Sequence, residues 1–374
     1  MNQVNIKNFR TFVIFLFLST SVLGQKVTYN HIVNPNDQDT TEVMTLFENY
    51  LSSKYKKIEN SSWNLEELEK YENYDFLENE FQPSLYMGFP VHVLSIKFNK
   101  NICEIKAQFS YCKDDGSPYI LAIVNYYAKK QNGIYKLYNA LNINKLDWNC
   151  TTVGLIDFYY PKYHKLNFEK AYKLNDFIIQ TCEKFKVKPK TFDYYLADSY
   201  DEIQKLKGID YYIGMGGKLY PKGVTDTVNN NVYCGGLGEY YLHEVFHVQI
   251  DQHYPNKHLW VSEGLATLLG GSRGENLNWH IKRTNSYLQD HPEINLNNML
   301  ALKNLDDQTT YHYVLGGLIA KKILEKGGWN LVIEFMSSGK TDDDYYNAIQ
   351  KYLGIKRLDI NNYLRKQLLI ESKY

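Results

Sequence analysis

The sequence predicts an α+β fold, in which a helix and an antiparallel sheet come first and a mostly helical region with a small sheet follows. Residues 40–57 carry apolar side chains at helical spacing. Residues 91–140 contain apolar runs of strand length, separated by turn sequences such as Gln131-Asn132-Gly133. After residue 239, helical patterns predominate. These three observations place the main sheet before the main group of helices.

The remaining elements follow from local patterns. In the first part, strands are expected at 91–98, 102–109, 119–127 and 134–138. In the second part, strands are expected at 153–159 and 192–196, and helices at 167–186 and 200–206. A loop-rich stretch is expected between two glycine clusters, at 214–217 and 235–236, which flank it. Near the end, Thr341 and Asp344 resemble a capping box before a helix at 345–352.

The chain divides into three expected segments. Residues 1–24 have the pattern of a signal peptide, because the basic Lys7 and Arg10 precede a short apolar run and cleavage is expected before Gln25. Residues 25–150 form an N-terminal α+β domain, and residues 151–374 form the second domain. The protein is therefore expected to be secreted or periplasmic. No other run is long and apolar enough to leave a stable membrane span after signal cleavage.

Composition excludes some partners. The 42 basic residues are balanced by 42 acidic residues, so no basic surplus indicates nucleic acid or an anionic membrane as a partner. The five cysteines are an odd number without a CxxC pair, which predicts mainly buried thiols with room for one disulfide.

The most informative segment is His243-Glu244-Val245-Phe246-His247. Two histidines four residues apart lie on one face of a helix, so both imidazoles can reach one zinc ion at about 2.0–2.1 Å. Glu244 then lies beside the metal, where it can accept a proton from water. The spacing predicts a zinc site with Glu244 as the general base.

The third ligand is expected from the segment Leu259 to Ala266. Catalytic zinc sites use three protein ligands and leave one position for water. Glu263 supplies a carboxylate on a second helix, and its small neighbours Gly264 and Ala266 let that helix pack closely on the first. His243, His247 and Glu263 are therefore the expected ligands of one Zn²⁺ ion.

Two nearby residues offer alternatives. His253 has the spacing of a third histidine ligand, but that arrangement needs a sharp turn that the β-branched Ile250 resists. Asp251 lies one helical turn beyond His247, where it is either a partner of that histidine or, as we expect, a solvated carboxylate.

These motifs resemble the gluzincin metallopeptidases, in which HExxH is followed by a glutamate ligand in a frame such as W-L-x-E-G-x-A. This chain has Trp260-Val261-Ser262-Glu263-Gly264-Leu265-Ala266 in the corresponding place. The resemblance covers roughly residues 190–374. It is nearest to the peptidase MA-like group, and thermolysin and the aminopeptidase N-like enzymes are more distantly similar.

The resemblance implies further roles. It implies that the segment 232–235 is an edge strand that aligns the substrate backbone, and that helices at 314–326 and 341–370 form a C-terminal helical part. It also implies that Tyr313 in a Y-x-x-G segment steadies the oxyanion, with Tyr311 and His312 as alternatives. No G-A-M-E-N-like stretch precedes the motif, so the resemblance does not extend to aminopeptidase activity.

The sequence therefore predicts zinc-dependent hydrolysis of peptide bonds in peptides or proteins outside the cytoplasm. The expected partner is a peptide or protein substrate, and no nucleic acid is expected. The alternative is a non-catalytic secreted or envelope binding protein with a vestigial zinc site. The presence of Glu244 argues against that alternative, because a structural zinc needs no base.

Overall fold

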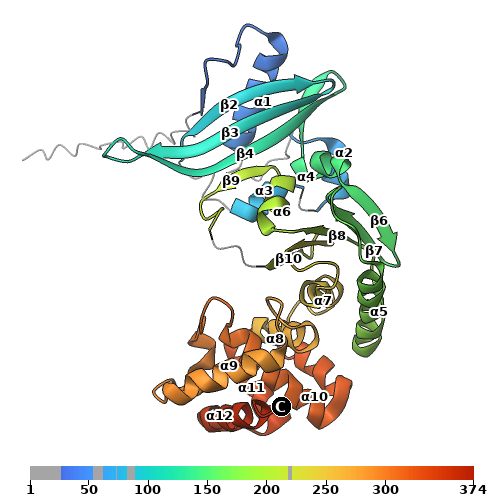
Figure 1. Cartoon of the computed structure of the whole chain (residues 1–374), viewed down its shortest axis with the longest axis vertical. Helices are drawn as coiled ribbons and strands as arrows, with labels where there is room; N and C mark the ends of the chain where they lie inside the picture. The colour runs from blue at the N-terminus through green and yellow to red at the C-terminus, as the bar shows by residue number, and fades with distance from the viewer. Residues whose placement is uncertain (1–26, 54–61, 73, 82–88, 218–220) are drawn as a thin grey trace, which may run out of the picture.

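The computed structural model describes residues 27–53, 62–72, 74–81, 89–217 and 221–374. In these ranges the protein is a mixed α and β structure, as expected, with a sheet at one end, a second sheet in the middle and a group of helices at the other end (Figure 1). The predicted signal peptide, residues 1–24, lies outside the described residues.

The first sheet has six strands in the order β1-β2-β3-β4-β5, with β9 paired to β4. Its strands β2 to β5 are antiparallel neighbours, and β1 runs parallel to β2. The bounds of the strands are Val27–Tyr29 for β1, Val91–Asn99 for β2, Ile102–Cys112 for β3, Pro118–Gln131 for β4, Ile134–Tyr138 for β5 and Ile209–Tyr212 for β9.

One amphipathic helix covers this sheet. Helix α1, Gln38–Ser53, buries Phe47 and Tyr50, whose rings both pack on the ring of Tyr126 from β4. The sequence predicted this helix and the four strands β2 to β5. Their apolar residues recur about every 3.6 residues in the helix and every second residue in the strands. Shorter helices connect this part to the next: α2 Leu65–Lys70, α3 Phe76–Phe81, α4 Ala140–Asn144 and α6 Tyr200–Leu206.

The second sheet has five strands in the order β10-β11-β8-β7-β6. Strands β7 and β11 run parallel to the central β8, and the outer strands β6 and β10 are antiparallel to their neighbours. The bounds are Asn149–Val153 for β6, Ile156–Tyr160 for β7, Phe192–Ala197 for β8, Lys222–Asp226 for β10 and Asn231–Gly235 for β11. Helix α5, Phe168–Phe185, packs beside this sheet.

Two sequence predictions about this sheet are wrong. The strand expected at 153–159 is a hairpin of β6 and β7, because Gly154 turns the chain with a φ of 60°. The strand at 232–235 is not an edge strand: β11 lies between β8 and β10, and all of its residues are buried. The edge is β10, which lies in the stretch expected to be a loop.

The two parts of the chain are joined through β9. This strand belongs to the second part in sequence, yet it pairs with β4 of the first sheet. A buried ion pair adds to the contact, because the ammonium of Lys207, before β9, meets the carboxylate of Glu80 in α3. Residues on both sides of position 150 therefore build the middle of the molecule.

The C-terminal group consists of helices, as predicted. They are α7 Leu242–Ile250, α8 Leu259–Gly270, α9 Leu277–Asp290, α10 Tyr311–Met336, α11 Asp342–Leu353 and α12 Ile360–Glu371. The capping box of Thr341 and Asp344 is confirmed at the start of α11. The helix expected at 314–326 is longer, and α10 continues past an irregular Gly328.

Helices α8 and α10 cross in very close contact. A Cβ atom added to Gly264 would lie 2.3 Å from the carbonyl carbon of Gly316. Only glycine fits such an approach of two backbones. Because Gly264 directly follows Glu263, this close crossing also fixes the position of Glu263 relative to α10.

Two further expectations concern the whole chain. All five cysteines are free thiols, so the disulfide for which the sequence left room is not formed. No helix within the described ranges has the length and apolar content needed to cross a bilayer.

We expect Gly264→Ala to lower the free energy of unfolding by about 1–3 kcal/mol, because the added methyl group would overlap the backbone of α10. In an exposed helix the same change is stabilising by up to about 1 kcal/mol, so the sign of the effect is diagnostic. Urea denaturation followed by circular dichroism measures it. A variant more stable than the parent chain would contradict the close crossing.

Candidate metal centre

Two helices deliver the three predicted ligands. Helix α7 buries Phe246 on one face and carries His243 and His247 on another, where they are 3% and 7% exposed. Helix α8 begins at the cap residue His258, whose Nδ1 accepts a hydrogen bond of 3.1 Å from the amide of Trp260. One turn later, α8 presents Glu263 towards α7. The local sequence thus forms the buried helix α7 and the capped helix α8, and the faces that carry the polar ligands point towards each other.

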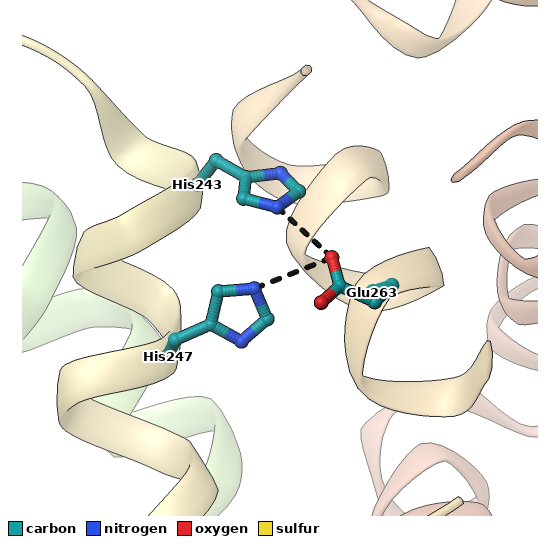
Figure 2. Close-up of side chains that lie close together, drawn as sticks. All are labelled: His243, His247 and Glu263. Atoms are coloured by element: carbon teal, nitrogen blue, oxygen red, sulfur yellow. Dashed lines mark hydrogen bonds and ion pairs between the residues drawn. The ribbon is translucent and has the colours of Figure 1, made fainter. Parts of the chain in front are cut away.

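The three side chains converge on one point (Figure 2). Oε2 of Glu263 lies 3.2 Å from Nε2 of His243 and 3.5 Å from Nε2 of His247. One ligand atom from each residue lies within 4.8 Å of the other two. The structure therefore brings together all three residues that the sequence named as ligands.

Hydrogen bonds orient both imidazoles. Nδ1 of His243 lies 2.7 Å from the carbonyl oxygen of Gly271, which can only accept a hydrogen bond. Nδ1 of His247 lies 3.0 Å from Oδ2 of Asp251. Each Nδ1 must therefore carry a proton. In the neutral tautomer, each Nε2 then directs a lone pair at the carboxylate of Glu263.

Such an arrangement requires a positive charge. Two nitrogen lone pairs and a carboxylate oxygen repel each other unless a cation or a proton lies among them. In the protein alone, the proton takes this role. Burial opposes charge on His247, but its hydrogen bonds to Asp251 and Glu263 prevail and raise its pKa well above the usual value. Burial likewise opposes charge on Glu263, but the two histidines hold its pKa well below the usual range.

Asp251 is a partner of His247 rather than the solvated carboxylate that we expected. Ser262 donates a hydrogen bond of 2.7 Å to its Oδ1, and the ammonium of Lys257 lies 3.6 Å from its Oδ2. The spacing from His247 to Asp251 allowed this contact, but only the position of Ser262 on α8 decides it.

His253 does not belong to the centre. Its side chain is exposed in the turn after α7, beside Tyr254 and Asn330, and the group that can hold a metal among the described residues excludes it. The chain does not make the sharp turn that a histidine ligand at this position would need.

Glu244 directly follows His243 on α7, and its side chain faces a pocket. The hydroxyl of Thr225, on β10, lies 2.7 Å from Oε2 of Glu244 and 2.9 Å from the backbone carbonyl oxygen of Glu244, so its one proton is donated to this pair of acceptors. The sequence gave no sign of Thr225, because strand β10 lay in a stretch without a clear apolar period. The contact holds the carboxylate of Glu244 at the edge of the second sheet.

Tyr313 faces the same pocket. Its ring packs edge-on against His243, with 5.5 Å between the ring centroids. Burial and the nearby carboxylate of Glu263 raise the pKa of Tyr313 to about 12, so its hydroxyl keeps its proton. The ring of His312 packs edge-on against that of Tyr313, whereas Tyr311 is buried near Tyr287 and Arg365. Of the three candidates, Tyr313 is the one that lines the pocket.

The pocket has a volume of 340 Å³. Its walls come from α6, β9, β10, the start of α7, the turn after α8 and the start of α10. The wall includes the side chains of Tyr200, Asp201, Tyr212, Lys222, Arg273 and Tyr313. A small organic group or a stretch of peptide therefore has access to Glu244 from one side.

No protein-family model matches this chain, and no curated protein matches it either. The function of the chain must therefore be inferred from the residues of the centre and the pocket.

We expect the purified chain to bind one Zn²⁺ ion. Loss of a residue that only hydrogen-bonds a metal ligand weakens binding by about 10–100-fold. We expect a larger loss of zinc affinity when a ligand itself is removed, in His243→Ala, His247→Ala and Glu263→Ala. Competition with a chromophoric chelator measures the affinity. His253→Ala is the matched control and should bind zinc as tightly as the parent chain. Full retention of zinc by Glu263→Ala would contradict this ligand set.

Asp251→Asn should weaken zinc binding by about 10–100-fold, because the carboxylate orients His247 and makes its Nε2 more basic. The same competition assay measures the loss. Asp342→Asn is a suitable control, because Asp342 also pairs with a histidine, Nε2 of His258 at 3.3 Å, but lies outside the centre with an exposed side chain. Equal effects of the two substitutions would show that Asp251 has no special role.

Proposed function

We propose that this protein is a zinc-dependent hydrolase of peptide bonds that acts outside the cytoplasm. The observation that carries the proposal is the meeting of His243, His247 and Glu263 at one buried point, while Glu244, the residue after His243, lines the wall of a pocket. Structural zinc sites close all four positions with protein ligands. Three ligands and an adjacent free carboxylate are instead typical of hydrolytic sites.

The donor set fits zinc. Two imidazole nitrogens and one carboxylate oxygen are the ligands found in catalytic zinc sites of the His₂Glu type. Both histidines have the Nδ1 partners that such ligands require, in Gly271 and Asp251. A bound Zn²⁺ ion would polarise the carbonyl group of the substrate and lower the pKa of a water molecule to near 7.

The chain's own residues divide the remaining work. Glu244 is the general base, which takes the proton of the attacking water and passes it to the leaving amine. The hydrogen bond from Thr225 orients its carboxylate through Oε2, and no residue that the structure describes bonds to its other oxygen, Oε1, which can take this proton. Tyr313 keeps a protonated hydroxyl and donates a hydrogen bond to the negative oxygen that develops on the substrate.

Strand β10 is the element that would hold the substrate. It lies at the edge of the second sheet, so one side of its backbone has no strand partner among the described residues. Its residues line the pocket next to Glu244. An extended peptide can add to such an edge through main-chain hydrogen bonds, and this would place one of its peptide bonds beside the base. This mode of binding favours a peptide over other ester or amide substrates.

Glu244→Gln should abolish most peptide cleavage while leaving zinc binding intact, because the amide keeps the shape of the side chain but cannot accept the proton of water. General bases contribute about 10²–10⁴-fold to rate, and the loss should fall in that range. The test incubates an unbiased peptide pool with the zinc-loaded chain and identifies the products by mass spectrometry.

Glu371→Gln serves as a control, because Glu371 is a carboxylate paired with Lys321 and Lys322 on the C-terminal helices. It should cleave as the parent chain does. A parent chain that binds zinc but cleaves no peptide would instead favour a binding protein with a vestigial metal site.

A further inference from the structure

Two cationic side chains flank the pocket beside Glu244. Lys222 begins strand β10, and Arg273 lies in the turn that follows α8. The ammonium of Lys222 lies 4.2 Å from the ring centroid of Tyr200. Neither cation forms an ion pair with a described residue, whereas the nearby Lys207 pairs with Glu80. Both charges are therefore available to a ligand.

The turn that carries Arg273 is held firmly. The hydroxyl of Tyr241 accepts a hydrogen bond of 3.4 Å from the backbone amide of Arg273. The buried His280 lies 3.1 Å from the carbonyl of Ser272, and Gly271 accepts the hydrogen bond from His243. Arg273 itself has a φ of 52°, which a side-chain-bearing residue adopts at some cost. The turn thus links the position of Arg273 to that of a candidate zinc ligand.

Charges in and around the pocket do not balance. A divalent ion at the centre would be offset by Glu263 and Glu244. Of the other charged residues in the pocket wall, Asp201 offsets only one of Lys222 and Arg273. The nearby Glu80 is already paired with Lys207. One positive charge is left over in a partly enclosed space, where the attraction to an anion is stronger than in open water.

We propose that Lys222 and Arg273 recognise a carboxylate of the substrate close to the bond that is cleaved. This inference rests on the proposed function and narrows it to peptides that carry such a group. The carboxylate belongs either to the C-terminus of the peptide or to an aspartate or glutamate side chain. Guanidinium and ammonium groups bind both through charge-assisted hydrogen bonds.

The first test compares cleavage. The zinc-loaded full chain is incubated with one peptide pool that has free C-termini and with the same pool amidated. Cleavage should concentrate at bonds with a carboxylate at a fixed, short distance. Loss of cleavage on amidation identifies the C-terminus as the source, and a preference for Asp and Glu over Asn and Gln identifies the side chain.

The variants then separate the roles. Lys222→Met, Arg273→Met and the double variant should lose the preference by about tenfold or more for each cation removed, which is the usual effect of losing a hydrogen bond between charged groups. Cleavage of neutral peptides should persist. Lys222→Arg keeps the positive charge and should therefore keep the preference. Lys340→Met, at an exposed lysine outside the pocket, should leave the preference unchanged.

Binding provides a measurement that needs no turnover. In the Glu244→Gln background, the zinc-loaded chain should retain peptides with a carboxylate, and adding Lys222→Met and Arg273→Met should release them. Equal retention of free and amidated, acidic and neutral peptides would overturn the inference. If the parent chain cleaves peptides without any preference for a carboxylate, the inference fails and the proposed function stands. If it cleaves none, the proposed function fails and binding alone decides the inference.

Discussion

Three lone pairs directed at one buried point require a positive charge there, and the rest of the site depends on that requirement. The imidazoles of His243 and His247 cannot turn away, because their Nδ1 atoms are tied to Gly271 and Asp251. Glu263 cannot turn away either without losing both histidines. A proton can supply the charge, but a metal ion satisfies all three ligands at once and repays their burial better. The chemistry of the centre is therefore a consequence of how its ligands are held.

Glycine determines the position of the carboxylate. Helix α8 approaches α10 at Gly264, and it approaches α7 at its other end, where a Cβ on Gly270 would lie 2.5 Å from the amide nitrogen of His243. These two contacts fix α8 against both neighbouring helices. A larger residue at either place would overlap the neighbouring backbone and push α8, and with it Glu263, away from its present position. The three ligands therefore meet only because the backbone of α8 lies this close to the backbones of α7 and α10.

The sequence predicted what local patterns encode and missed what depends on tertiary contacts. The ligand set was predictable because His243 and His247 share a helical face and Glu263 sits in a frame of small residues. The first sheet was predictable because its strands alternate regularly. Strand β10 was missed because Lys222–Asp226 is short, polar and glycine-containing, so that only its pairing with β11 makes it a strand. The roles of Asp251 and Thr225 likewise depend on residues distant in sequence or on another element.

The N-terminal sheet helps to position one wall of the pocket. Tyr212 lines the pocket, yet its strand, β9, is held by pairing with Ala122 on β4. Tyr200 lines the same pocket from α6, which packs between the two sheets. The wall opposite α7 and α10 therefore takes its position partly from residues before 150. A peptide bound along β10 would meet that wall, so the first part of the chain would set the width of the cleft in which the proposed chemistry takes place.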